Sequence, residues 1–124
     1  MPERSKDWLD QAERDLKRCE LDIEYEFYEW ACFTAQQSAE KAIKALAYYL
    51  KGMPWGHSLV LLLKNMQNII KVPQTIIEDA QLLDAYYISA RYPNGWPAGT
   101  PKDYFNEKKA KEAYEAARRI FTFC

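Results

Sequence analysis

The sequence has a single histidine, His57, and its three cysteines, Cys19, Cys32 and Cys124, stand far apart. A metal centre made of several histidines or of a C-x-x-C pair is therefore excluded. An odd number of isolated cysteines also does not suit a disulfide framework, so a reducing cytoplasm is expected. Serine nucleophile signatures, H-E-x-x-H and glycine-rich phosphate loops are missing as well. We therefore predict neither a resident metal nor a cofactor.

The chain also lacks an excess of charge of one sign and a long apolar run. Its 17 basic and 18 acidic residues leave a formal net charge of -1, which excludes a uniformly basic coat for nucleic acid. A charge this close to zero does little to prevent self-association, so an oligomer is compatible with it. No window approaches the roughly 18 apolar residues of a membrane span, and the start of the chain lacks the apolar core of a signal peptide. A cytoplasmic protein with no membrane contact is expected.

Strand-like alternation is absent over any useful length, and helical periodicity takes its place. Helices are predicted at about 5–24, 29–51, 58–70, 74–91 and 106–123. Ser5 and Ser58 are suited to begin helices, while Gly52 and Pro93 are suited to end them. Because short connections favour antiparallel neighbours, we predict an all-α fold: one domain over 1–124, an antiparallel up-and-down bundle of four to five helices.

The predicted helix at 29–51 carries two stripes. On a helical wheel its apolar sector holds Cys32, Ala35, Ala39, Ala42, Ile43, Leu46 and Leu50, which indicates a side facing the core. A flanking sector holds Phe33, Gln37, Glu40, Lys44 and Lys51. That flank is either a solvated edge or one half of a binding surface.

Asp84, Tyr87 and Arg91 recur at helical spacing just before the segment 92–105, which is rich in proline and glycine. On a shared helix face, the Arg91 guanidinium can grip a phosphate with two hydrogen bonds, while Asp84 and Tyr87 hold its orientation. The same spacing also fits a structural salt bridge. His57 has two readings as well: a general acid that assists Arg91, or a packing residue in the loop before Ser58.

Several segments together resemble the HEPN domain family, and the resemblance covers nearly the whole chain. They are Trp8, Ala12 and Asp15-Leu16, then Gln36 to Leu46, His57-Ser58-Leu59, Leu83 to Tyr87, Arg91-Tyr92-Pro93, and Ala110 to Ala117. The resemblance implies an antiparallel helical bundle that is usually dimeric and has a nucleotide-related or RNA-related role. It also implies a possible minimal nucleotidyltransferase partner in a toxin–antitoxin pair.

Many members of that family are metal-independent ribonucleases with an arginine followed a few residues later by a histidine. Arg91 matches the arginine, but residues 92–97 supply no histidine. The resemblance therefore predicts ligand binding without a catalytic residue, unless His57 replaces the missing histidine from another loop or from a dimer mate. The predicted ligand-binding residues are Arg91, Tyr87, Asp84, Lys44, Glu40 and His57.

Three functions follow from these observations. The first is binding of a nucleotide or RNA phosphate, or of a nucleotidyltransferase partner, by a homodimer. The second is RNA cleavage without metal by Arg91 and His57. The third is a structural module that contacts only other proteins.

Overall fold

The computed structural model describes residues 4–124, and over that span it contains helices and no strands. The α-helices are α1 (Ser5–Glu24), α2 (Tyr28–Tyr49), α3 (Leu59–Met66), α4 (Gln74–Asp84), α5 (Tyr86–Ser89) and α6 (Glu107–Phe123). Two short 3-10 helices, η1 (Pro93–Gly95) and η2 (Pro101–Asp103), lie between α5 and α6. The predicted all-α fold is confirmed. The first three residues of the predicted domain lie outside the described part of the chain.

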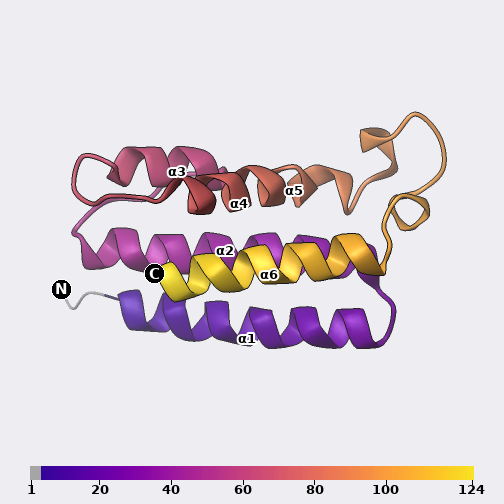
Figure 1. The fold of residues 1–124 in the computed structure, drawn as a ribbon, viewed down its shortest axis with the longest axis horizontal. Coiled ribbons are helices and arrows are strands. Elements are labelled where there is room, and N and C mark those ends of the chain that lie inside the picture. The colour runs from indigo at the N-terminus through magenta and orange to yellow at the C-terminus, as the bar shows by residue number, and fades with distance from the viewer. Residues whose placement is uncertain (1–3) are drawn as a thin grey trace.

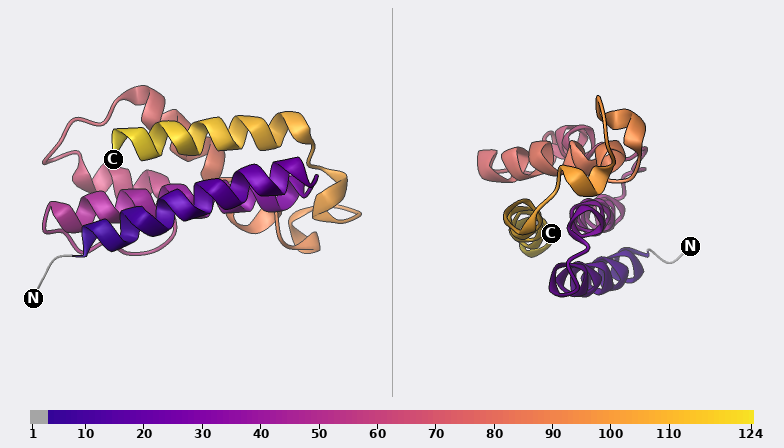
Figure 2. Two further views of the ribbon diagram at one scale, coloured as in Figure 1. Left: turned by 90° about the horizontal axis from the view of Figure 1, so that it is seen from below. Right: turned by 90° about the vertical axis from the view of Figure 1, so that its right-hand side faces the viewer.

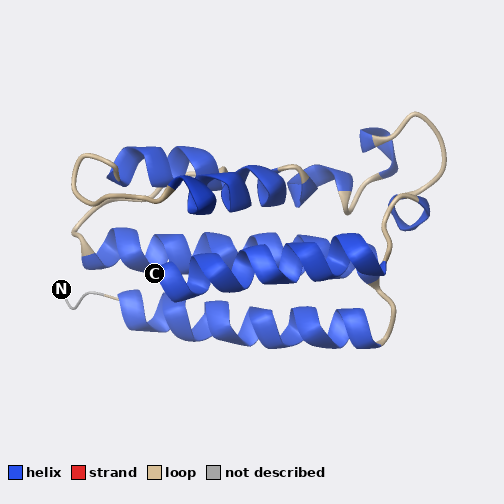
Figure 3. Ribbon diagram, viewed as in Figure 1, coloured by secondary structure: helices blue, strands red, loops and turns tan. Residues whose placement is uncertain are grey.

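Helix α2 lies in the middle of the bundle and contacts α1, α3, α4, α5 and α6 (Figures 1 and 3). Helix α1 covers one side of it, α3, α4 and α5 cover the opposite side, and α6 lies alongside (Figure 2). The long helices α1, α2, α4 and α6 alternate in direction along the chain, as predicted for an up-and-down bundle (Figure 1). Side chains of α2 therefore lie at interfaces with each of the other α-helices.

Small side chains let the other helices approach α2 closely. Ala35, Ala39 and Ala42 of α2, which belong to the predicted apolar stripe, are completely buried, and so is Ala31. Ser38 is also buried, and its hydroxyl donates a hydrogen bond of 2.7 Å to the Ala12 carbonyl of α1. The neighbouring helix is thereby fixed without leaving a buried polar atom unpaired.

Helix α2 ends near the predicted residue, but a residue other than the glycine adopts the left-handed conformation. The residue in the left-handed conformation is Lys51, with φ of 67°, rather than Gly52. The Gly52 amide donates to the Ala47 carbonyl at 2.8 Å. A Cβ atom at Gly52 would lie 3.2 Å from that same carbonyl oxygen, so glycine is favoured here by close approach rather than by its φ.

The late helix predicted at 74–91 is interrupted and shorter than expected. It breaks at Ala85 into α4 and α5, and helical structure ends at Ser89, so Arg91 lies just beyond it. A continuing helix would need an amide at position 93 to bond the Ser89 carbonyl, and Pro93 has none. The Trp96 indole donates to that carbonyl instead, at 2.7 Å.

The segment 92–105, expected to be irregular, is held together by its own side chains. Trp96 stacks on Tyr104 with ring centroids 4.0 Å apart. The Asp103 carboxylate accepts the Thr100 amide at 2.9 Å, and this hydrogen bond holds the pKa of that carboxyl below its usual value. The segment is therefore a fixed platform beside Arg91.

Asp84 does not orient Arg91, contrary to the sequence prediction. Its carboxylate accepts the backbone amides of Leu59 at 2.8 Å and Val60 at 3.1 Å, and the Ser58 hydroxyl at 3.2 Å. Ser58 is also the N-cap of α3, as predicted, and accepts the Leu61 amide. A carboxylate at this position satisfies the amides that a helix start leaves without partners, so Asp84 joins α4 to α3.

Replacing Asp84 with alanine should lower the free energy of unfolding by about 1–2 kcal/mol, because the first amides of α3 lose their acceptor. Urea denaturation followed by circular dichroism measures the change. Glu78→Ala, an exposed carboxylate on the same helix, is the control and should change stability far less. Equal effects of the two substitutions would contradict the capping role.

Candidate functional site

Five of the six predicted site residues form one continuous row of contacts, here called the Glu40 row: Lys44, Glu40, His57, Tyr87 and Arg91. Lys44 donates to Glu40 at 3.2 Å, and His57 contacts the same carboxylate through Nδ1. The His57 ring stacks on Tyr87 with centroids 4.7 Å apart, and the Arg91 guanidinium lies 4.8 Å from the Tyr87 centroid. Residues from α2, α5 and two loops thus meet in one site.

Arg91 is held by aromatic rings and a backbone carbonyl instead of by an acid. Its Nε donates to the Tyr87 carbonyl at 2.9 Å, while its Cζ lies 4.3 Å from the centroid of Phe33 and 4.8 Å from that of Tyr92. Within residues 4–124 it forms no ion pair with a carboxylate. The salt bridge that the spacing allowed is therefore not made.

Glu40 is the buried acid of the site, with a side chain only 7% exposed. Both of its oxygens lie near Nδ1 of His57, at 3.0 and 3.1 Å. A carboxylate can only accept here, so Nδ1 carries the proton and Nε2 of a neutral His57 is left as the acceptor. Gln36 donates to the His57 backbone carbonyl at 3.0 Å, which fixes the loop as well as the ring.

Lys44 balances Glu40 inside the protein. Its side chain is 12% exposed, and its ammonium lies 5.8 Å from the Trp8 ring centroid. The Lys44 ammonium and the Glu40 carboxylate are buried and 3.2 Å apart, so they largely cancel each other's field. Arg91 is therefore the principal free positive charge of the Glu40 row.

A hollow of about 240 Å³ adjoins Arg91 on the side of the loop segment, and we call it the Trp30 hollow. It is lined by Glu29 and Trp30 of α2, Ala90 and Arg91 after α5, and Thr100, Pro101 and Lys102 at η2. The sequence prediction missed Glu29, Trp30 and Lys102. The only available signal was the three-residue spacing of Trp30 and Phe33 on the α2 flank, and their rings do meet, at 6.1 Å.

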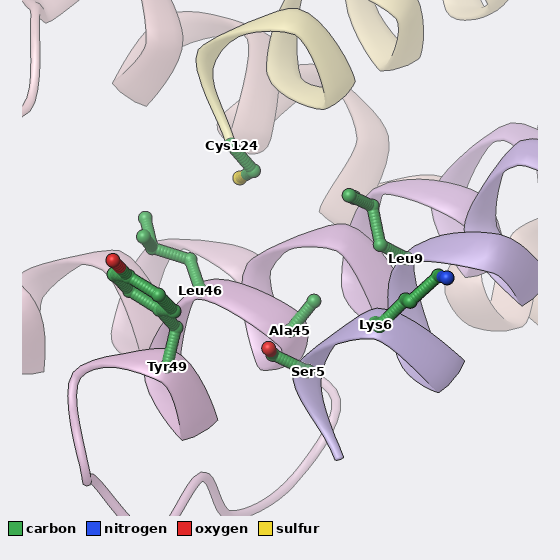
Figure 4. Close-up of a pocket in the computed structure, with 7 residues that line it drawn as sticks. All are labelled: Ser5, Lys6, Leu9, Ala45, Leu46, Tyr49 and Cys124. Atoms are coloured by element: carbon green, nitrogen blue, oxygen red, sulfur yellow. The ribbon is translucent and has the colours of Figure 1, made fainter. Parts of the chain in front are cut away.

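A second hollow, of about 310 Å³, lies where α1 begins and where α2 and α6 end (Figure 4). Leu9, Leu46, Tyr49 and Cys124 are among the side chains that line it, and Lys6 is its single cationic side chain. Burial raises the pKa of the Cys124 thiol to about 12, so the thiol stays protonated and weakly nucleophilic. This hollow offers much less polar chemistry than the Arg91 region.

Two features are absent from residues 4–124. No group of three or more histidine, cysteine, aspartate or glutamate side chains is arranged to hold a metal ion. None of the helices there combines the length and apolar character needed to cross a membrane.

Comparison with known proteins gives one family. The HEPN domain profile matches residues 5–124. TT1696 from Thermus thermophilus is 38% identical, with 98% of this chain and 96% of that chain covered and a TM-score of 0.95. The archaeal HEPN homologue ST0689 is 36% identical, with coverages of 99% and 95% and a TM-score of 0.83. The HEPN domain protein tm0613 from Thermotoga maritima is 31% identical, with coverages of 94% and 92% and a TM-score of 0.78. No curated protein matches. By its sequence over almost its whole length and by its fold, the chain belongs to the HEPN domain family.

Proposed function

We propose that this protein binds a nucleotide or RNA through a phosphate group at Arg91, in the cytoplasm. The observation that carries the proposal is a half-buried guanidinium, enclosed by Phe33, Tyr87 and Tyr92, that has no acidic partner among residues 4–124. Nε is already bonded to the Tyr87 carbonyl, and Nη1 donates one hydrogen bond to the Tyr92 hydroxyl at 3.5 Å, so Nη2 and the second hydrogen of Nη1 are the donors that can reach a phosphate.

The surrounding rings strengthen such an interaction. They remove water from the faces of the guanidinium and lower the local dielectric constant, so its attraction for a phosphate is greater than on an open surface. They also fix the planar group, which reduces the conformational entropy lost when a ligand binds.

We also propose a protein partner: a second copy of this chain, or a minimal nucleotidyltransferase in a toxin–antitoxin-like pair. Residues 19–40 contain no lysine, arginine or histidine, and the turn between α1 and α2 is acidic. Apolar side chains are exposed at the same end: Leu21 by 49%, Tyr25 by 66%, Phe27 by 54% and Trp30 by 43%. An acidic surface with exposed rings suits a partner that presents a basic or apolar surface.

Replacing Arg91 with alanine should weaken binding of a short single-stranded RNA and of mononucleotides about 10–100-fold, the loss expected for charge-assisted hydrogen bonds. Isothermal titration calorimetry measures the affinities. Arg14→Ala, an exposed arginine on α1, is the matched control and should leave them unchanged.

The affinity of the wild-type protein for these ligands decides between phosphate binding and a purely structural role. Wild-type protein that binds neither ligand would contradict the phosphate site and favour the purely structural interaction module. In that case Arg91→Ala would change only the assembly state, which light scattering reports.

RNA cleavage remains a second candidate because of one geometric feature, the Glu40–His57 pair. Glu40 holds Nδ1 of His57 at 3.0 Å, and the ring packs on the same Tyr87 that Arg91 contacts. Nε2 is then suited to accept the proton of a ribose 2′-hydroxyl as its oxygen attacks phosphorus and the 5′-oxygen leaves with a proton from water. Arg91 would stabilise the charge on phosphorus.

If this candidate is correct, purified protein cleaves RNA in the presence of EDTA and leaves 2′,3′-cyclic phosphate ends. His57→Ala should lower the rate about 10²–10⁴-fold, since general base catalysis is lost. Gel electrophoresis of a labelled RNA measures the rate, and Trp55→Ala, in the same loop, is the control. Intact RNA after long incubation with wild-type protein would exclude the nuclease function.

A further inference from the structure

We infer that the Trp30 hollow receives the base of the bound nucleotide and that it prefers guanine. The inference rests on the proposed phosphate site, because Arg91 belongs to both. A nucleotide whose phosphate lies on the outer nitrogens of Arg91 has its base within reach of this hollow. The volume of about 240 Å³ is below the roughly 300 Å³ at which pockets for whole drug-sized ligands begin, so it suits one planar ring system.

Two apolar side chains that line the hollow, Trp30 and Pro101, can pack against a flat ring. Trp30 is 43% exposed, and its ring is fixed edge-on against Phe33 at an interplanar angle of 80°. Pro101 lines the same hollow, is buried, and begins η2, which the Thr100–Asp103 capping box holds in place. A partly exposed tryptophan that already packs against a neighbouring ring is a suitable platform for a base.

The polar groups of the hollow select among bases. The Glu29 carboxylate and the Lys102 ammonium form no hydrogen bond or ion pair with other residues of the described chain. One is a pure acceptor and the other a pure donor. A base that satisfies both must present adjacent N–H groups on one edge and acceptors on another.

Guanine meets that requirement best. Its N1–H and N2 amino group can donate together to the two oxygens of Glu29, while O6 and N7 accept from lysine. Adenine and cytosine each offer a single amino group to the carboxylate, and uracil offers one imino N–H flanked by carbonyl oxygens that the carboxylate repels. The pattern of donors and acceptors therefore ranks guanine first and uracil last.

Calorimetric titration of the full chain with GMP, AMP, CMP, UMP and ribose 5-phosphate tests the inference. GMP should bind about tenfold more tightly than UMP, and Glu29→Gln should abolish that difference while leaving the affinity for ribose 5-phosphate unchanged. Trp30→Ala should weaken all four nucleotides about tenfold without affecting ribose 5-phosphate. Lys102→Met, at an exposed position, should reduce the preference for GMP over CMP.

Glu24→Gln and Trp55→Ala are the matched controls, since both side chains are exposed and neither lines the hollow. If GMP binds no more tightly than ribose 5-phosphate, or if Glu29→Gln keeps the wild-type ranking of bases, the base site is refuted while the phosphate site stands. If neither the nucleotides nor ribose 5-phosphate bind to the wild type, the phosphate site itself fails.

Discussion

The buried carboxylate of Glu40 is the constraint on which the site depends. An ionised carboxyl in the interior is costly unless it is paired, and Glu40 is paired twice, by Lys44 one helical turn away and by His57 from the loop after α2. The second pairing fixes the imidazole, the imidazole stacks on Tyr87, and the carbonyl of Tyr87 holds Arg91. One local requirement for charge compensation therefore determines how α2, the loop at His57 and α5 are placed around a single cation.

The parts of this arrangement that repeat with helical periodicity could be predicted from the sequence. The apolar stripe of α2 is buried as predicted at Ala35, Ala39 and Ile43. The flank residues Phe33, Glu40 and Lys44 contact members of the Glu40 row, and Glu40 is itself buried. Asp84 shows the limit of that reasoning. Spacing assigned it to the same face as Tyr87, but a face does not determine which neighbour a carboxylate meets. The first backbone amides of α3 have no partner within their own helix, and they donate to the Asp84 carboxylate.

Contacts between distant segments could not be predicted from the sequence either, because helical periodicity does not determine which segments meet. Pro93 predicted the end of the late helix, yet the position of Arg91 beyond that end depends on Trp96, whose indole replaces the amide that proline lacks. The Trp30 hollow joins the first turn of α2 to η2, two segments far apart in the chain. Neither segment carries a recognisable binding motif, and the hollow forms only when the folded bundle brings the two segments together.

The balance of charge within the site explains how a protein with a net charge of -1 can present the proposed anion site. Overall charge matters little, because salt screens exposed charges beyond about 8 Å at physiological ionic strength. Close to the site, Lys44 offsets Glu40, so neither adds much to the field at Arg91. The acidic residues between α1 and α2 lie on the surface, where water weakens their effect, whereas Arg91 is enclosed by Phe33, Tyr87 and Tyr92. Within this enclosure the Arg91 guanidinium contacts Phe33, Tyr87 and Tyr92, and His57 reaches it only indirectly, through the Tyr87 ring. The proton transfer of the nuclease candidate would depend on the Glu40–His57 pair instead.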